Sequence, residues 1–196
     1  EQNDSKMRCI DEEIPFKLPN TWNWCRLKSI CKKIIDGSHN PPKGSELKTQ
    51  YIMASSRNIV NNMISDLGNA RYLNKTDFVK ENSRTNVSIN DIFLTTVATL
   101  GRSCIYDGIP KNLCFQRSVT IISTYISPKY LKIFFDAPHF QDVIKNNAMG
   151  TAQKGFYLNQ LEVTLVCVPP KTEQERIVNR IHQLLLHIQN VEKNLN

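Results

Sequence analysis

The sequence predicts a mixed α/β domain, with a twisted mixed sheet and short helices, followed by a long C-terminal helix of the coiled-coil type. Three observations support this fold class. β-rich runs come from separated parts of the chain, helical segments lie between and after them, and a heptad pattern fills the C-terminal end. We expect a flexible lead-in over residues 1–13, a single domain over 14–170 and the helix over 171–196.

Each element of this prediction has a local signal. Apolar, β-branched runs predict strands, two segments that carry proline at the first turn predict short helices, and apolar spacing predicts one more short helix. A polar segment with mixed charges predicts an irregular surface excursion. The strands are expected at 51–60, 87–99, 103–106, 114–126 and 161–168, the helices at 26–35, 128–135 and 138–149, and the excursion at 61–88.

The start of the C-terminal helix follows from a junction of strand, proline pair and cap. Pro169 and Pro170 end the last strand, because proline lacks the N–H that a strand pair needs. Thr172 and Glu175 have the spacing of a capping box, in which each side chain binds a free backbone N–H of the first turn. The sequence therefore predicts a helix that begins near Glu173.

The predicted helix carries an apolar seam that advances by alternate steps of four and three residues. A seam of this kind fits a partner helix, although an ordinary core-facing terminal helix has the same local pattern. We expect the seam to meet either a second helix or other subunits. Its residues are Ile177, Ile181, Leu184, Ile188, Val191 and Leu195, widened by Val178 and Leu185.

The amino-acid composition indicates which kinds of molecule the protein can bind. The 196 residues carry a net charge of +7 at pH 7, and this basic balance favours a polyanion such as nucleic acid. Six cysteines occur without a CxxC pair, which favours reduced thiols in a cytoplasmic protein over a zinc site or a disulfide framework. No signal peptide is recognised, no apolar run reaches membrane-spanning length, and the missing N-terminal Met predicts a processed or excised chain.

Polar and basic side chains recur in several predicted loops, and they are of the types that contact DNA. Arg can bridge guanine O6 and N7, Asn and Gln can pair with adenine, and Ser, Thr and Lys bind phosphates more often. Each residue alone is more typical of a solvated surface, but the recurrence favours a DNA-binding face. The candidates are Ser38, His39, Lys43, Ser56, Arg57, Asn58, Thr99, Arg102, Gln116, Arg117, Thr151, Gln153 and Lys154.

A metal-dependent nuclease is the main competing hypothesis. Asp36, Glu46 and Lys48 have the spacing of a nuclease triad, in which two carboxylates bind Mg²⁺ and a lysine lies near the attacking water. These residues flank a loop rich in Pro and Gly, whereas such a triad needs a rigid strand. The four histidines show no metal-ligand spacing, so the sequence predicts neither a catalytic residue nor a metal site.

An ordered series of segments resembles the specificity subunit of type I restriction-modification systems. The segments are LPNTWNWCRLKSIC, IIDGSH, MASSRNI, INDIFLTTVATLGR, GTAQKGFYLNQL and PPKTEQERIV, which together span residue 14 to the end. The resemblance implies one target-recognition domain for double-stranded DNA and the start of one conserved helix. In this family, two such domains read the two halves of a split DNA site, and antiparallel helices hold them apart.

The resemblance also implies partners. Methylation and restriction subunits dock on a specificity subunit and supply the chemistry of S-adenosylmethionine, ATP and Mg²⁺, so no cofactor is expected in this chain. The sequence holds only one recognition domain, which predicts either an excised half or a half-length subunit that dimerises through its C-terminal helix. The resulting hypothesis is a non-catalytic, sequence-specific DNA-binding subunit. An assembly module that contacts no DNA is a further alternative to the nuclease.

Overall fold

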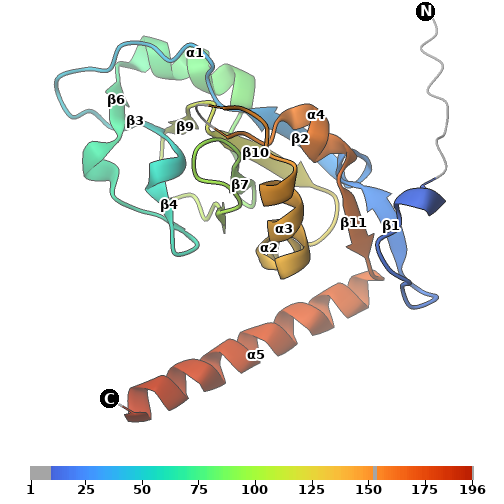
Figure 1. Ribbon diagram of the computed structural model, residues 1–196. Coiled ribbons are helices and arrows are strands. Elements are labelled where there is room, and N and C mark those ends of the chain that lie inside the picture. The colour runs from blue at the N-terminus through green and yellow to red at the C-terminus, as the bar shows by residue number, and fades with distance from the viewer. Residues whose placement is uncertain (1–9, 152–153, 196) are drawn as a thin grey trace, which may run out of the picture.

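A computed structural model describes residues 10–151 and 154–195 (Figure 1). Its centre is an antiparallel sheet with the strand order β2-β10-β7-β8. The strands are β2 (Cys31–Asp36), β10 (Val119–Thr124), β7 (Ile92–Thr95) and β8 (Ser103–Ile105). β7 and β8 lie within the predicted strands 87–99 and 103–106, and they pair antiparallel with Phe93 opposite Cys104.

Smaller sheets surround the central one. The order β6-β3-β9 joins β6 (Arg71–Leu73), β3 (Tyr51–Ala54) and β9 (Leu113–Phe115). β3 pairs parallel with β9 and antiparallel with β6, so this sheet is the mixed one. Two antiparallel pairs complete the strands: β4 (Ile59–Val60) with β5 (Met63–Ile64), and β1 (Asn23–Arg26) with β11 (Leu165–Val168).

The central strands are apolar on both faces because each face has its own core. Successive side chains of a strand point to opposite faces. In β7, Ile92 and Leu94 enter a core shared with the helices, whereas Phe93 enters a core shared with β3 and β9. The helices of the first core are α2 (Pro128–Asp136), α3 (Pro138–Asn146) and α4 (Leu158–Val163). The predictions of α2 and α3 from their leading prolines are confirmed.

The predicted excursion at 61–88 is wrong, because it contains α1 (Lys75–Thr85). Asn74 caps this helix by accepting a hydrogen bond of 2.8 Å from the Asp77 N–H. Only Phe78 and Thr85 of α1 are buried, so its apolar stripe is too short to give a helical pattern in the sequence. Earlier in the same segment, the structure also has a 3₁₀ turn, η4 (Leu67–Asn69), that leads into β6.

Three other predicted elements are wrong in part. The predicted single strand at 114–126 contains most of β9 and all of β10, which belong to different sheets. The segment 26–35 forms a 3₁₀ turn, η2 (Leu27–Ile30), and then strand β2, because its apolar residues pair with β10 in the sheet. The segment 161–168 begins inside α4, and only its second half is strand β11. Further 3₁₀ turns lie at η1 (Asp11–Glu13) and η3 (Ser56–Asn58).

The long helix α5 (Lys171–Leu195) leaves the domain after β11 and extends beneath it (Figure 1). It begins two residues before the predicted start, because the Pro170 carbonyl accepts hydrogen bonds from the N–H groups of Glu173 and Gln174. Thr172 therefore lies inside the helix and is not its N-cap. No helix within the described ranges is long and apolar enough to cross a membrane.

Candidate nucleic-acid interface

The predicted loops meet at one end of the two larger sheets. Because neighbouring strands are antiparallel, the C-terminal ends of β2 and β7 lie beside the N-terminal ends of β10 and β8. The parallel strands β3 and β9 end there as well, since Ala54 pairs with Phe115 and an isolated bridge joins Ser38 to Gln116. The loops after β2, β3, β7 and β9 therefore share one face, which we call the loop face.

Backbone hydrogen bonds fix these loops to one another. The Ser38 N–H donates to the Phe115 carbonyl at 2.7 Å, and the Arg117 N–H donates back to the Ser38 carbonyl at 2.8 Å. The Ala98 N–H donates to the Lys154 carbonyl at 3.1 Å, which ties the loop between α3 and α4 to the same face. These main-chain contacts hold the loops in place without using the exposed side chains, which remain available for a ligand.

A glycine makes the closest of these contacts possible. A Cβ atom on Gly37 would lie 2.3 Å from the Gln116 carbonyl oxygen and 2.4 Å from that of Phe115. Real Cβ atoms do not approach backbone atoms so closely, so only glycine lets the two loops cross here. Arg84 of α1 reaches the same point and donates to the carbonyls of Asp36 and Gly37.

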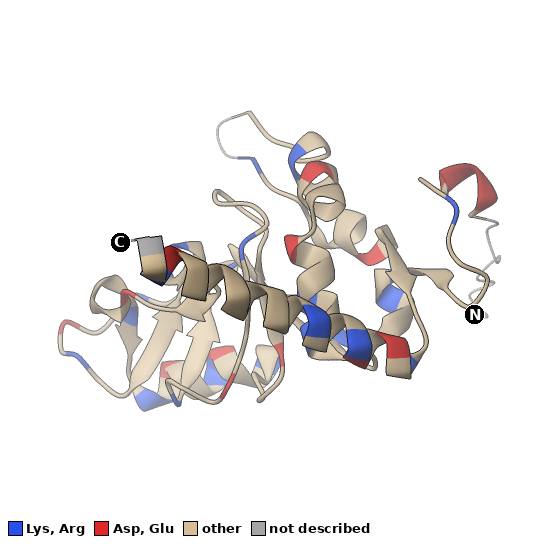
Figure 2. Ribbon diagram, turned by 90° about the horizontal axis from the view of Figure 1, so that it is seen from below, with Lys and Arg blue, Asp and Glu red and all other residues tan. Residues whose placement is uncertain are grey.

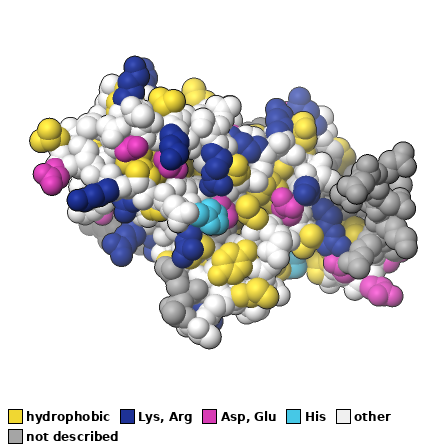
Figure 3. Space-filling view, turned by 90° about the horizontal axis from the view of Figure 1, so that it is seen from above, with side chains coloured by type: hydrophobic (Ala, Val, Ile, Leu, Met, Phe, Trp, Pro, Cys, Tyr) yellow, Lys and Arg dark blue, Asp and Glu magenta, His cyan; other side chains and the backbone are white. Residues whose placement is uncertain are grey.

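The candidate residues differ in their accessibility on this face. The side chains fall into an exposed set, a half-buried set and a buried set, and Gln153 lies outside the described residues. The exposed residues are His39, Lys43, Arg57, Arg102, Arg117, Thr151 and Lys154, the half-buried ones are Thr99 and Gln116, and the buried ones are Ser38, Ser56 and Asn58. Figure 3 shows Lys and Arg side chains spread over the upper face of the molecule.

Asn58 holds the loop in which it lies. Its Oδ1 accepts a hydrogen bond of 2.9 Å from the Ser55 N–H, and its Nδ2 donates to the carbonyls of Ser65 and Asp66. The neighbouring Ser56 N–H donates to the Ser118 hydroxyl at 3.0 Å. Ser55 and Asn58 have the spacing of a capping box, and this spacing in the sequence indicates a structural role for Asn58.

Sequence reasoning did not assign Thr120, Thr96 or Tyr157 to the face. Thr120 Oγ1 donates to Asp36 Oδ1 at 2.5 Å and lies 3.0 Å from Thr96 Oγ1. Burial raises the pKa of Asp36, and the Thr120 hydrogen bond, His39 and Arg84 act in the opposite direction. Thr120 lies in β10 and Thr96 directly follows β7, and both are buried, so no local pattern distinguished them from core residues.

The proposed nuclease residues do not share one rigid element. Asp36 is buried at the end of β2, whereas Glu46 and Lys48 are exposed in the loop that follows. Among the described residues, no group of three or more His, Cys, Asp or Glu side chains could hold a metal ion. The nuclease remains a competing hypothesis that plasmid cleavage with Mg²⁺ tests, with Glu46→Ala as the inactive variant.

Among the seam side chains that the structure describes, those near the start of α5 are partly covered and the later ones are exposed. Ile177 and Ile181 are half-buried, but Leu184, Ile188 and Val191 are 46%, 54% and 57% exposed. Seen from below, the charged residues of α5 lie near its two ends (Figure 2). Residues 181–191 contain no Lys, Arg, Asp or Glu. The backbone of Leu195 belongs to α5, but its side chain lies outside the described part of the structure.

The molecule thus combines a mixed α/β domain, a loop face with basic side chains and a long helix with an uncovered seam. Residues 19–196 match the family model described as "Type I restriction modification DNA specificity domain". The chain belongs to this family, which confirms the resemblance found in the sequence.

Relatives and solved structures agree with this family. The specificity subunits of the type I restriction enzymes EcoBI and EcoAI from Escherichia coli are 30% and 24% identical to this chain, over 67% and 89% of its length. The chain spans 28% and 30% of those two relatives. The HsdS subunit from Thermoanaerobacter tengcongensis matches with a TM-score of 0.62 and 14% identity, over 92% of this chain and 41% of that one.

Two further structures show the same fold. The S subunit of a type I restriction-modification system from M. genitalium has a TM-score of 0.58 and 17% identity, over 91% of this chain and 43% of that one. A structure that describes complex assembly and conformational transition of the type I R-M system has a TM-score of 0.66 and 16% identity, and covers 94% and 44% of the two chains. The mixed α/β fold class is confirmed.

Proposed function

We propose that this chain is a non-catalytic DNA-binding module that reads one half of a bipartite target in double-stranded DNA. The observation that carries the proposal is the loop face, where Lys43, Arg57, Arg102, Arg117 and Lys154 are exposed on loops fixed by backbone hydrogen bonds. Basic side chains on such loops can neutralise phosphates and can reach base edges. The family of DNA specificity domains supports the same proposal.

We also propose that α5 acts as a spacer that docks other chains or segments. A helix of 25 residues is about 37 Å long, and its uncharged middle needs a second apolar surface to cover it. That surface is a second recognition module or a second copy of this chain, together with the methylation and restriction subunits. S-adenosylmethionine, ATP and Mg²⁺ then belong to those partner subunits. The cytoplasmic location expected from the sequence is part of this proposal.

Selection from a randomised duplex library, followed by binding to the enriched duplex at several salt concentrations, tests the DNA-binding role. Affinity should fall steeply with salt, by a slope of about 0.9 on a log-log plot for each neutralised phosphate. Arg57→Ala, Arg102→Ala and Lys154→Ala should each weaken binding, whereas Lys129→Ala should not. Lys129 is the matched control because it is exposed at the first turn of α2, at the other end of β10.

The same measurement separates the alternatives. An assembly module without DNA contacts predicts that all four variants leave affinity unchanged. Affinity that is flat between about 50 and 200 mM salt would contradict a basic DNA-binding face. Cleavage of plasmid by the isolated chain with Mg²⁺, abolished by Glu46→Ala, would replace the proposal by the nuclease.

A further inference from the structure

A small hollow of about 90 Å³ opens on the loop face. It is lined by Asp36, His39, Val97, Arg117 and Tyr157, which come from three of the converging loops and the segment before α4. Asp36 is an acidic residue among basic neighbours, so it weakens the attraction of this face for phosphates. Its presence in the hollow therefore needs an explanation other than phosphate binding.

The Asp36 carboxylate is held in one orientation. Thr120 has a single hydroxyl proton, which it donates to Asp36 Oδ1 at 2.5 Å, so the Thr96 hydroxyl donates in turn to Thr120. The second oxygen, Oδ2, lies 3.7 Å from His39 Nε2, which is beyond hydrogen-bond length. One oxygen is thus fixed from behind, and the other lies beside a histidine whose side chain is 56% exposed.

We propose that Asp36 Oδ2 accepts a hydrogen bond from the exocyclic amino group of a base, and so determines which base this chain selects at one position of its target. In the major groove, such amino groups belong to cytosine (N4) and adenine (N6). This inference rests on the proposed DNA-binding function. Burial deprives the charged Asp36 carboxylate of water and so disfavours its charged form. A hydrogen-bond donor from the DNA stabilises that charged form in place of water.

Arg117 favours cytosine as the source of the amino group. Its exposed side chain lines the same hollow, and an arginine pairs with O6 and N7 of guanine. A carboxylate and a guanidinium side by side therefore match both members of a C·G pair, one as acceptor and the other as donor. Adenine in a T·A pair also offers an amino group. Its only acceptor in the major groove is N7, whereas guanine offers Arg117 both O6 and N7.

Selection from the randomised duplex library with wild-type chain and Asp36→Asn tests the proposal. In the variant, Thr120 holds the amide oxygen, and the amide NH₂ takes the place of Oδ2. One position of the selected half-site should change from cytosine, or adenine, to a base with an acceptor such as guanine or thymine, with roughly a tenfold change in preference. The other positions should stay the same. The base that the wild-type chain selects at this position shows whether the amino group belongs to cytosine or to adenine.

A second measurement needs no protein variant. In the selected duplex, pyrimidin-2-one replaces the cytosine, or purine replaces the adenine, so that only the amino group is lost. Wild-type affinity should fall roughly tenfold at the assigned position and less when another cytosine or adenine of the site is replaced. This measurement decides the question if Asp36→Asn fails to fold.

Four outcomes would contradict the inference or the proposed function, and they are distinguishable. If Asp36→Asn leaves the base preference unchanged, the inference is overturned. It is also overturned if the variant loses affinity equally for all sequences and its binding depends less steeply on salt. That result would mean that Asp36 positions His39 on a phosphate. Equal sensitivity to amino-group removal at all positions would overturn it too. If the wild-type chain enriches no sequence at all, the proposed function itself fails.

Discussion

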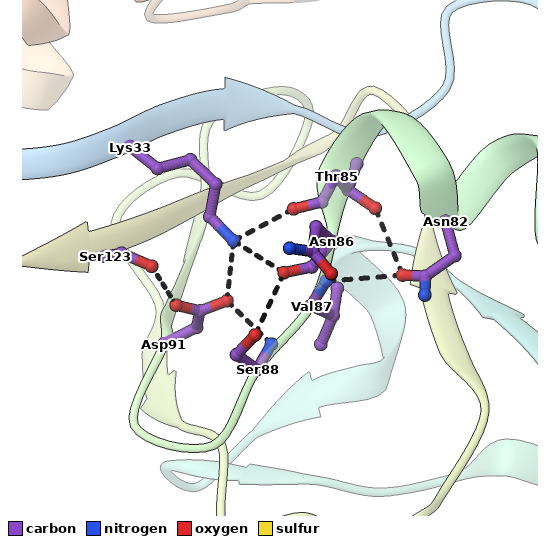
Figure 4. Close-up of polar contacts among 8 residues, drawn as sticks. All are labelled: Lys33, Asn82, Thr85, Asn86, Val87, Ser88, Asp91 and Ser123. Carbon is purple, nitrogen blue, oxygen red and sulfur yellow. Dashed lines mark hydrogen bonds and ion pairs between the residues drawn. The ribbon is translucent and has the colours of Figure 1, made fainter.

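The Lys33 ammonium group lies 2.9 Å from Asp91 Oδ2 and joins α1 to the central sheet (Figure 4). Lys33 also donates to the carbonyls of Thr85 and Asn86 at the end of α1, at 2.9 and 2.8 Å. Asp91 in turn accepts from the Ser88 N–H at 2.9 Å and from the Ser123 hydroxyl. A single lysine therefore neutralises a buried carboxylate and binds the free carbonyls of a helix C-terminus.

Lys33→Met should lower the free energy of unfolding by about 3 kcal/mol, because it leaves Asp91, whose side chain is 3% exposed, without its cation. Urea unfolding at pH 7 measures this loss. Lys32→Met is the matched control, since Lys32 is the preceding, exposed residue of the same strand. Its ammonium group lies 5.6 Å from the centre of the Tyr125 ring, so this change should cost at most about 1 kcal/mol. Equal stabilities of the two variants would contradict the role of Lys33.

Gly37→Ala should disrupt the loop face, because the new Cβ would overlap the carbonyls of Phe115 and Gln116. We expect a loss of roughly 2 kcal/mol or more in stability and weaker DNA binding, since the loop after β9 must move. Gly68→Ala is the control, because nothing lies within 4 Å of its Cβ position. Circular dichroism melting and binding to the selected duplex give the two readouts. A Gly37→Ala chain with wild-type stability would show that the loops do not cross so closely.

Several strands and the loops could be predicted from the sequence, but the strand β2, which was expected to be helical, and the loop face could not. Ile92 and Ile121 lie in long β-branched runs because both faces of the central sheet are buried, and such runs are recognisable locally. The meeting of Ser38 with Gln116 depends on the parallel pairing of β3 with β9, which no local pattern specifies. The individual loops were therefore predictable, whereas their convergence required the topology.

Burial also decides which predicted residues are free to contact a ligand. Arg57 and Asn58 are adjacent in the sequence and equally polar, yet Arg57 is exposed and Asn58 holds three backbone groups. The helix α1 was missed for a related reason, since Phe78 and Thr85 are its only buried residues. A sequence pattern detects an element through its buried positions, and α1 has too few of them.

Gln174→Ala should loosen the attachment of α5 to the domain. The Gln174 side chain accepts from the Ser127 N–H at 3.0 Å and donates to the Pro169 carbonyl at 2.9 Å, and the residue is 4% exposed. The loss of both bonds should cost about 1–3 kcal/mol and speed amide exchange over residues 171–178. Gln183→Ala, an exposed change on the same helix, serves as the control. Unchanged exchange over 171–178 in Gln174→Ala would contradict this anchoring role.

Leu184→Glu with Ile188→Glu should weaken association through α5, because two charges would enter the uncovered seam. We expect association, with a second copy or with partner subunits, to weaken roughly 30-fold or more while the domain stays folded. His182→Glu with Gln189→Glu adds the same charge on the opposite side of the helix and should have little effect. Sedimentation velocity and subunit pull-down measure the result. If neither changes in the seam variant, α5 does not associate through this seam.

Stability should fall above pH 9 because of two buried thiols. Burial raises the pKa of Cys104 and of Cys114 from 9.0 to about 12. The unfolded chain therefore loses these protons at lower pH than the folded chain, so each thiol lowers the stability by up to about 1.4 kcal/mol per pH unit between pH 9 and 12. Urea unfolding at pH 8.5, 9.5 and 10.5 measures the slope. The double variant Cys104→Ala, Cys114→Ala should be less stable at pH 8.5 but show a shallower alkaline decline, and an unchanged slope would contradict the assignment to these two thiols.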